Sequence, residues 1–286
     1  MRRKTTYDDF QVHHTPERLK NWRRAVGYSQ RDRLYRGAAD LIVYRLPSPV
    51  PAAAGKKIIF ISDFHYHGSS TQRKIVQCIR EHLFRIKPDL LLFGGDVCSD
   101  SDTLHLIPDL LRQLSSAVSS AIAVPGNWER GKSWISTERW KEIFSRGGFD
   151  IAFNEFRTIG DIQIFCADDP ACGNPIFPGR WEDDKLHILL AHRPDTVIAL
   201  DTPQIPAPHL ALCGHTHGGQ IRIPFFGPFF TASIYGCALD YGLFEHKQNN
   251  AQMIISGGLG HMSFPLRINC RKEMVLIEFS DTFIQH

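Results

Sequence analysis

The chain has 286 residues, of which 43% are hydrophobic and 22% charged, and its formal net charge is +3 at pH 7. These values are typical of a globular protein and exclude a disordered, collagenous or coiled-coil chain. This length is enough to bury a sizeable core, in one large domain or in two.

Segments that would direct the chain to or across a membrane are not evident in the sequence. Residues 1–25 contain no apolar run like the core of a signal peptide, and no later run approaches the roughly 18 to 20 apolar residues of a membrane span. The seven cysteines are scattered and never spaced C-x-x-C. We therefore expect a cytoplasmic protein with reduced thiols.

Residues 1–46 form a basic, aromatic segment with a net charge of +6, from eleven Lys or Arg against five Asp or Glu. Such a mixture suits an anionic membrane surface, where tryptophan and tyrosine prefer the interface. A solvated arm, or a helix packed on the domain, would explain it equally well. Residues 47–286 carry 22 basic against 25 acidic side chains and offer no basic groove, so we expect no nucleic-acid partner. No protein partner can be inferred.

A short Pro/Ala-rich connection, residues 47–55, leads into a body at 56–286 in which strand-length apolar runs alternate with helical patterns. The apolar runs predict strands at 57–62, 90–93, 121–124, 162–166, 186–191 and 210–213. The 3.6-residue pattern predicts helices at 71–87, about 103–118, and around 137–144. Continuously apolar strands alternating with helices indicate an α/β fold whose central strands are buried on both faces.

Polar side chains follow directly on most of these strands, and in α/β sheets ligands bind outside the carboxyl ends of the strands. In chain order the candidate ligands are Asp63, His65, Asp96, Asn127, His192, His215 and His217. All are oxygen or imidazole donors, which suit Mn²⁺, Fe²⁺ or Zn²⁺ better than a structural zinc site. Each short motif alone is usually a turn, but five in this order are unlikely to arise by chance.

Two features of the spacing favour a centre with two metal ions. The i, i+2 spacing of Asp63 with His65, and of His215 with His217, places each pair on one side of an extended backbone. A single carboxylate such as that of Asp96 could then bridge two cations about 3.5 to 4 Å apart, an arrangement that clamps both attacking and leaving oxygens of a phosphoryl group.

With these motifs the chain resembles the calcineurin-like metallophosphoesterase family, whose signature runs D-x-H, G-D, G-N-H-D/E, H and G-H-x-H. The resemblance covers residues from about 56 to the end. The run G-H-T-H-G-G-Q-I-R-I-P-F-F-G-P, with G-G-L-G-H-M-S-F-P-L-R-I-N after it, is similar to one branch of that family. This branch contains bacterial membrane-associated phosphodiesterases and one class of UDP-2,3-diacylglucosamine hydrolases of lipid A synthesis.

The resemblance implies a four-layer α/β/β/α sandwich, preceded here by the basic segment, and a site with two divalent cations, of which Mn²⁺ is our first choice. By the family pattern one ion would be held by Asp63, His65, Asp96 and His217. The other would be held by Asp96, Asn127, His192 and His215. Asp96, Asn127 and His192 would thereby take part in activating the attacking water.

One position departs from the family pattern: Trp128 follows Asn127, where most members have histidine. An indole can donate a hydrogen bond but cannot supply a proton at neutral pH. Departure of an alkoxide without an acid would be slow, whereas a phosphate monoester leaves as a stable anion. Trp128 therefore favours cleavage of a diphosphate bond, unless His67 or His261 supplies the acid or the indole merely packs.

Further candidates for substrate contact follow from residue type. The loop 221–230 carries four phenylalanines, including Phe225 and Phe226, and would contact a membrane or acyl chain if exposed, or belong to the core if buried. Arg193, Arg267 and Asn269 are candidates for phosphate contacts, since guanidinium binds phosphate bidentately, although either arginine could equally form a salt bridge.

Taken together, these observations predict a metal-dependent phosphoester hydrolase on the inner face of the cytoplasmic membrane. The expected substrate is a lipid-linked diphosphate, UDP-2,3-diacylglucosamine, cleaved to UMP and 2,3-diacylglucosamine 1-phosphate. One alternative is a less specific phosphodiesterase or phosphatase. A second alternative is a non-catalytic, metal-dependent binding module, although retention of all seven ligands argues against it.

Overall fold

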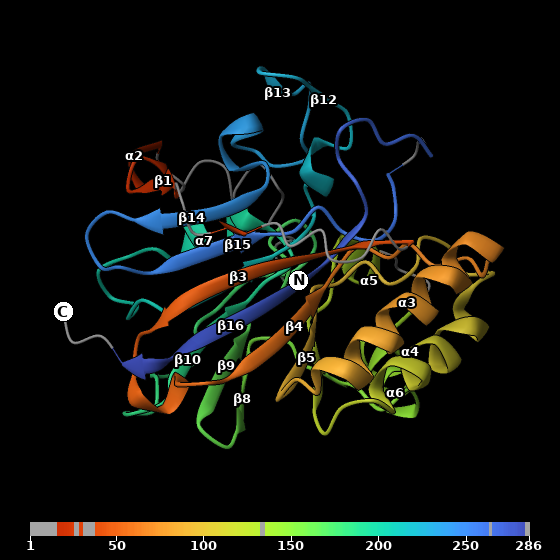
Figure 1. Ribbon diagram of the computed structural model, residues 1–286, viewed down its shortest axis with the longest axis horizontal. Helices are drawn as coiled ribbons and strands as arrows, with labels where there is room; N and C mark the ends of the chain where they lie inside the picture. Colours follow the sequence, from red (N-terminus) through yellow and green to blue (C-terminus); the bar gives the residue numbers. More distant parts are fainter. Residues whose placement is uncertain (1–15, 26–28, 31–37, 132–134, 263–264, 284–286) are drawn as a thin grey trace, which may run out of the picture.

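Two seven-stranded sheets form the centre of the protein in the computed structural model, which describes residues 16–25, 29–30, 38–131, 135–262 and 265–283 (Figure 1). In order across sheet A, the strands are β1 (Trp22–Arg24), β14 (Gly242–His246), β15 (Gln252–Ile255), β11 (Leu210–Cys213), β10 (Leu186–Leu190), β9 (Ile162–Cys166) and β8 (Glu155–Ile159). In order across sheet B, they are β2 (Ser29–Gln30), β3 (Asp40–Ser48), β16 (Glu273–Phe283), β4 (Lys57–Ile61), β5 (Leu90–Phe93), β6 (Ala121–Ala123) and β7 (Asp150–Ile151).

Side-chain alternation along the strands explains why they are apolar throughout. In β4, Ile58 and Phe60 belong to the cluster between the two sheets, whereas Ile59 and Ile61 belong to the cluster under the helices. Successive residues of a strand point to opposite faces, so both faces of β4 are covered. Strands β4, β5, β6 and β7 run parallel, as do β9, β10, β11 and β15, so their carboxyl ends gather at one rim of each sheet.

Helices cover the outer face of each sheet and complete four layers. Figure 1 shows α3 (Ser70–Ile86), α4 (Ile107–Ser115) and α6 (Thr137–Arg146) side by side against sheet B. Helix α7 (Pro194–Leu200) covers sheet A, where Val197 and Ile198 belong to the third apolar cluster. Two further short helices, α2 (Pro16–Leu19) and α5 (Asn127–Gly131), lie among the described residues. The expected α/β sandwich is thus confirmed.

Helix α3 illustrates how the sequence sets its limits. The Ser69 side chain accepts a hydrogen bond from the backbone N–H of Gln72, and Lys87 ends the helix in a left-handed conformation. Ile75, Ile79 and Leu83 lie on one face and are fully buried against sheet B.

The described part of the basic segment packs with the rest of the fold. Strand β1 pairs with β14, where Arg23 forms an ion pair with Glu245 (3.5 Å). Strand β3 pairs along its length with β16, which in turn pairs with β4. Residues on both sides of the connection at 47–55 therefore belong to one sheet. Six basic residues of the segment lie outside the described residues: Arg2, Arg3, Lys4, Arg31, Arg33 and Arg36.

Two expectations about the whole chain can also be compared with the structure. All seven cysteines are free. Within the described ranges, no helix combines the length and the apolar character needed to cross a membrane.

Candidate metal centre

The seven predicted ligands meet where the carboxyl ends of the two sheets face each other. Asp63, His65, Asp96 and Asn127 follow strands β4, β5 and β6 of sheet B. His192, His215 and His217 follow strands β10 and β11 of sheet A. Neither sheet alone carries the whole set, so the centre depends on the packing of one sheet against the other.

Within this set the side chains form two groups, each of which could hold a metal ion: Asp63 with His65 and His217, and Asp96 with His192 and His215. In the first, Nε2 of His65 lies 3.1 Å from Nε2 of His217, which is 3.6 Å from Asp63 Oδ1. This division matches the one implied by the family resemblance.

In the second group, the His192 Nε2 atom lies 3.1 Å from His215 Nδ1 and 3.0 Å from the amide oxygen of Asn127. The amide oxygen of Asn127 thus lies beside the second group, where it could serve as a further ligand.

Asp96 occupies the position between the two groups. Its Oδ2 atom lies 3.3 Å from His192 Nε2 and 3.8 Å from His65 Nε2, one nitrogen from each group. Its Oδ1 atom accepts a hydrogen bond from the backbone N–H of Trp128 (2.9 Å), which fixes the orientation of the carboxylate. This geometry suits a carboxylate shared between two cations.

Hydrogen bonds at the outer ring nitrogens leave the inner nitrogens of two histidines available as ligands. His192 Nδ1 lies 2.7 Å from the carbonyl oxygen of Gly94, and His215 Nε2 lies 3.2 Å from that of Ala232. A carbonyl can only accept, so each of these nitrogens carries a proton, and the opposite nitrogen can bind a metal once any proton on it has been displaced. His65 Nδ1 lies 2.7 Å from the Ser99 hydroxyl. Two lone pairs facing each other at 3.1 Å, as in His192 and His215, repel unless a cation or a proton lies between them.

Burial sets the protonation of the first group. It raises the pKa of Asp63 to about 6 and lowers the pKa of His65 to about 4. Burial likewise holds the pKa of His217 well below its usual range, with the nearby His65 and Arg267 acting in the same direction. Neutral imidazoles are the form that binds a metal.

In the second group, burial also holds the pKa of His215 well below its usual value. For His192 burial acts to lower the pKa, but the Asp96 carboxylate outweighs it and raises that pKa to about 10. A cation that binds between these residues must therefore displace a proton from His192.

The backbone at the centre is unusual. Five of the seven candidate ligands, Asp63, His65, Asp96, His215 and His217, have positive φ angles between 46° and 68°. Residues other than glycine seldom adopt this region, and such strain persists only where the surrounding contacts enforce it. The ligands are therefore held by the fold in conformations that these residues would not choose in isolation.

Two glycines beside the ligands are required because a ligand carboxylate lies very close to the Cα atom of each. A Cβ atom on Gly126 would lie 2.1 Å from Asp96 Oδ1, and one on Gly214 would lie 2.2 Å from Asp63 Oδ2. No side chain fits at either position without moving a ligand. The glycines of the G-N and G-H motifs thus admit the carboxylates to the centre.

Glu129 is a positioning residue that the sequence analysis did not single out, although it ends the run G-N-W-E, which corresponds to G-N-H-D/E of the family signature. It is buried, and its carboxylate accepts hydrogen bonds from the backbone N–H groups of Asp96 (2.8 Å), Val97 (2.8 Å) and Gly126 (2.7 Å). Burial, together with the charge of Asp96, raises the pKa of Glu129 to about 7. Glu129 joins the two loops that carry Asp96 and Asn127, so it positions both ligands.

A pocket of about 420 Å³ opens over the two groups. Besides the metal-ligating side chains, its wall includes Trp128, His67 and His261. The indole of Trp128 meets the ring of His65 edge-on at 6.1 Å, and the rings of His67 and His261 lie 6.3 Å apart. The residue that replaces the usual histidine and the two alternative acids thus share one pocket.

The structure does not bring the three predicted phosphate contacts to this pocket wall. Arg193 is buried with its Nε 2.9 Å from Asp169 Oδ2, and the Asn269 amide donates to the carbonyl oxygen of Arg222 (2.9 Å). Arg267 reaches beneath His217, with Nη2 2.7 Å from the Gly257 carbonyl oxygen and 3.2 Å from His217 Nδ1. Buried carboxylates and carbonyls compete for these side chains, and residue type alone could not show that.

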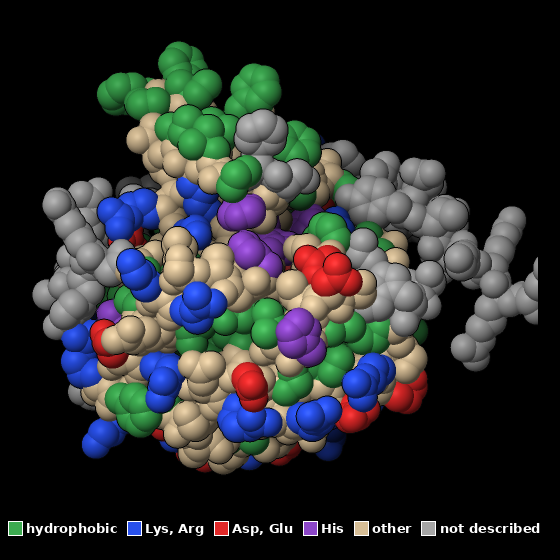
Figure 2. Space-filling model, turned by 90° about the vertical axis from the view of Figure 1, so that its right-hand side faces the viewer, with side chains coloured by type: hydrophobic (Ala, Val, Ile, Leu, Met, Phe, Trp, Pro, Cys, Tyr) green, Lys and Arg blue, Asp and Glu red, His purple; other side chains and the backbone are tan. Residues whose placement is uncertain are grey.

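Phe225 and Phe226 lie on the short hairpin β12 (Arg222–Ile223) and β13 (Gly227–Pro228), where their exposed fractions are 107% and 87%. Of the two interpretations open from the sequence, core or exposed surface, the structure selects the exposed one. Figure 2 shows an apolar projection at the top of this face, with histidine side chains below it.

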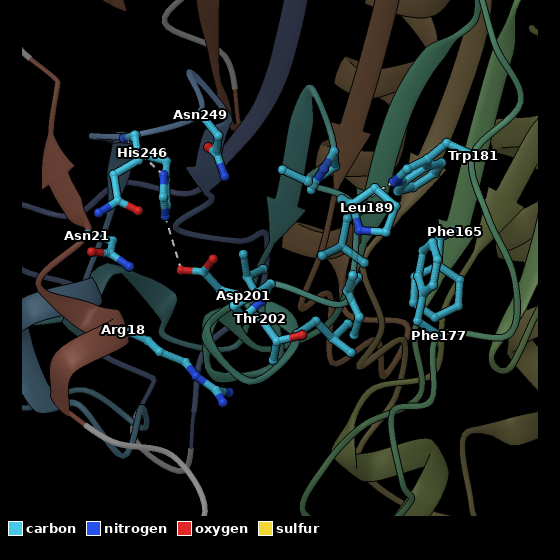
Figure 3. Close-up of a pocket in the computed structure, with 18 residues that line it drawn as sticks. Arg18, Asn21, Phe165, Phe177, Trp181, Leu189, Asp201, Thr202, His246 and Asn249 are labelled. Carbon is cyan, nitrogen blue, oxygen red and sulfur yellow. Dashed lines mark hydrogen bonds and ion pairs between the residues drawn. The ribbon is translucent and has the colours of Figure 1, made fainter.

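A separate cavity of about 520 Å³ lies on the outer side of sheet A (Figure 3). Figure 3 shows Phe165, Phe177 and Trp181 at one end and Asp201 facing His246 at the other. Asp201 and His246 are 3.2 Å apart, and Trp22 Nε1 also donates to Asp201. Neither group of metal-ligating side chains found in the described residues lies here, so the chemistry belongs to the pocket above the two groups.

Comparisons with known proteins show which family this chain matches. The family model of calcineurin-like phosphoesterases matches residues 56–219, which include all seven candidate ligands. The uncharacterized metallophosphoesterase YkuE of Bacillus subtilis (strain 168) is 33% identical over 243 residues, covering 80% of each chain. The phosphodiesterase YaeI of Escherichia coli (strain K12) is 29% identical over 250 residues, covering 85% of this chain and 88% of its own. Among solved structures, a Vps29 single mutant from Entamoeba histolytica aligns at 17% identity and a TM-score of 0.39, covering 79% of this chain and 87% of its own.

Proposed function

This chain belongs to the calcineurin-like phosphoesterase family, and from that premise we propose that it hydrolyses the diphosphate bond of a lipid-linked nucleotide. The preferred substrate is UDP-2,3-diacylglucosamine, with UMP and 2,3-diacylglucosamine 1-phosphate as products. The proposal places the enzyme in the cytoplasm, at the inner face of the membrane, with two Mn²⁺ ions as its cofactors.

The observation that carries the choice of a diphosphate is Trp128 in the wall of the pocket. Its indole can donate a hydrogen bond to a phosphate oxygen but has no proton to give to a leaving group at neutral pH. A phosphate monoester needs no such proton, because it leaves as a stable anion. A substrate whose leaving group is itself a phosphate therefore matches a pocket that has an indole in the usual position of the acid.

The residues of the centre have distinct parts in this reaction. Two divalent cations, when bound, supply Lewis acidity and lower the pKa of a water molecule. One cation would be held by Asp63, His65 and His217. The other would be held by Asn127, His192 and His215, and Asp96 would bind both. Glu129 holds the loops that carry Asp96 and Asn127 in position. Trp128 orients a phosphate oxygen. Preorganised charges of this kind account for much of the rate in phosphoryl transfer.

The direct test is to incubate the purified protein with Mn²⁺ and UDP-2,3-diacylglucosamine and to measure UMP. We expect UMP to appear with Mn²⁺ and to be absent with EDTA. The test also includes a simple aryl phosphodiester, whose leaving group needs no acid. A protein that cleaves the aryl ester but releases no UMP would contradict the diphosphate proposal and leave the phosphoesterase class intact.

A less specific phosphodiesterase is the second candidate, supported by two observations. His67 and His261 line the same pocket and could donate the proton that Trp128 cannot. The relative YaeI is itself named a phosphodiesterase. This candidate predicts turnover of an alkyl phosphodiester as fast as of any diphosphate, and loss of that turnover in the His67→Gln, His261→Gln double variant.

The non-catalytic alternative makes the opposite prediction. A binding module would take up Mn²⁺ tightly in calorimetry and turn over neither the aryl ester nor the diphosphate. Any metal-dependent turnover that Asp96→Ala abolishes would exclude it.

A further inference from the structure

The exposed apolar side chains of this protein are concentrated in one place. Of the ten large hydrophobic residues that are exposed among the described ones, eight lie in residues 221–230 and 266–268. We call this set the apolar cap: Ile221, Ile223, Phe225, Phe226, Phe229, Phe230, Leu266 and Ile268. The four phenylalanines are 60% to 107% exposed. Clusters of this kind on a protein surface mark contacts with other molecules or with membranes.

The two segments of the cap form one structural unit. Ile221 and Ile268 are joined by a parallel bridge, and the Arg222 N–H donates to the Ile268 carbonyl oxygen (2.9 Å). In the hairpin itself, Ile223 pairs with Gly227, and the Phe226 N–H donates to the Ile223 carbonyl oxygen (3.2 Å). These backbone bonds within the cap lower the cost of moving it out of water.

The cap is attached directly to the rim of the metal pocket. The hairpin begins within a few residues of His217, and the Gln220 side chain accepts a hydrogen bond from the backbone N–H of Met262 in the pocket wall (2.7 Å). At the other end, the carbonyl oxygen of Ala232 holds His215. Figure 2 shows the apolar side chains of the projection with histidine side chains below them. Whatever the cap contacts is therefore brought to the pocket.

Charges around the cap suit a lipid surface. Residues 218–239 contain no Asp or Glu and one basic residue, Arg222, which is bound to Asp240 Oδ2 (2.9 Å) and the Gly218 carbonyl oxygen (2.9 Å). The tip thus has no charge to desolvate. Arg271 and Lys272 lie three and four residues beyond Ile268, where Arg271 Nε is 3.0 Å from Asp40 Oδ2. Further basic side chains are visible below the projection in Figure 2. An uncharged tip above a basic base complements acyl chains beneath phosphate headgroups.

We propose that the apolar cap inserts into a lipid bilayer and holds the metal pocket at the headgroup level. The proposal deepens the proposed function, on which its biological meaning rests, because a diacylated substrate is presented in a bilayer. The binding itself is a property of the cap alone. A bilayer fits better than a second copy of the chain, since the phenylalanines stand on a convex projection and two such tips offer each other little matching surface.

The experiment measures co-sedimentation of the full chain with phosphatidylcholine vesicles containing one fifth phosphatidylglycerol, in EDTA and without substrate. We expect the wild type to sediment with the vesicles and the Phe225→Ser, Phe226→Ser double variant to lose at least tenfold in its partition coefficient. The matched control is Phe84→Ser, which removes an exposed phenylalanine (54%) from helix α3, outside the cap. This control should bind as the wild type does. The unfolding midpoint of each variant shows that it is folded.

Three results would overturn the proposal. The wild type could fail to sediment with the vesicles, or the double variant could bind as well as the wild type. Alternatively, analytical ultracentrifugation could show a dimer that only the cap substitutions dissociate, in which case the partner is a second copy. Because no turnover is measured, a negative result here leaves the diphosphatase proposal standing, and failure to release UMP leaves membrane binding standing.

Discussion

The metal centre and the apolar cap adjoin each other in the sequence and the structure, yet they are built in opposite ways. His215 and His217 are buried, with positive φ angles and hydrogen-bonded rings. Eight residues after His217, Phe225 also has a positive φ angle, but its side chain is entirely exposed. The centre is specified by many buried contacts around each atom, whereas the cap is specified by a short hairpin and by composition. Substitutions in the two regions should therefore affect different properties.

The largest effect is expected from Asp96→Ala, because this carboxylate lies between both groups of ligands. We expect turnover of an aryl phosphodiester to fall by at least roughly 10³-fold, since both cation positions lose a ligand. The fold should persist, as circular dichroism would show. Activity within tenfold of the wild type would rule out a shared carboxylate.

A smaller loss is expected from Glu129→Gln, which touches no cation but removes one of the two carboxylate oxygens from three backbone donors. Outer partners of metal ligands typically contribute about 10- to 100-fold to metal affinity or activity, and we expect a loss in that range. Calorimetry with Mn²⁺ measures the affinity, and the aryl ester measures turnover. The control is Glu142→Gln, an exposed residue of α6, which should change neither. Equal behaviour of the two variants would show that Glu129 has no positioning role.

The pH dependence of cation uptake follows from the pKa values of the cation-free centre. Below pH 6 burial keeps Asp63 protonated, and up to pH 10 the Asp96 carboxylate keeps His192 protonated, despite its burial. A cation must displace these protons, so its affinity should fall as the pH falls, by about tenfold per unit for each proton displaced. The decline should be steeper below pH 6, where Asp63 adds its proton to that of His192. Calorimetry with Mn²⁺ between pH 5 and 8 tests this, and an affinity independent of pH would contradict it.

The smallest effect is expected in the cap. Phe226→Ala should change the free energy of unfolding by no more than about 0.5 kcal/mol, because the side chain packs against little. By contrast, Phe60 is fully buried between the sheets, and Phe60→Ala should cost about 3 to 5 kcal/mol. Urea denaturation of both variants measures the difference. A cost above 2 kcal/mol for Phe226→Ala would mean that the cap is part of the core.

Sequence patterns predicted six of the parallel strands, and they selected candidate ligands that the structure brings together at one rim. Strands such as β4 and β5 are short, continuously apolar and followed by candidate ligands. A short stretch of sequence is therefore enough to predict both the buried strand and the ligands at its end. Strands β3, β14, β15 and β16 were not predicted, because what fixes them is pairing with distant segments. The last residues of the described chain, in β16, lie between β3 and β4. The sequence of β16 alone does not indicate with which strands it pairs.

The contacts of the residues around the ligands were harder to predict from the sequence. Arginine beside a phosphate site suggests phosphate binding, yet Arg193 and Arg267 meet a buried carboxylate and buried carbonyls instead. Glu129 could have been found from its place in the G-N-W-E motif, since a carboxylate beside a ligand turn often accepts backbone N–H bonds. The exposure of the cap depends on where the hairpin projects, and composition does not determine that.

The position of β16 has a consequence for how the protein is made. While the ribosome is still synthesising the chain, β4 has its partner β5 but lacks the strand that later separates it from β3. The nascent sheet therefore has an open edge until β16 has emerged, and open edges pair readily with other chains. Asp63, His65, Asp96 and Asn127 are synthesised well before the three histidines of the other sheet. The newly made half can thus hold only part of a metal centre, and full cation binding would report that the two sheets have closed on each other.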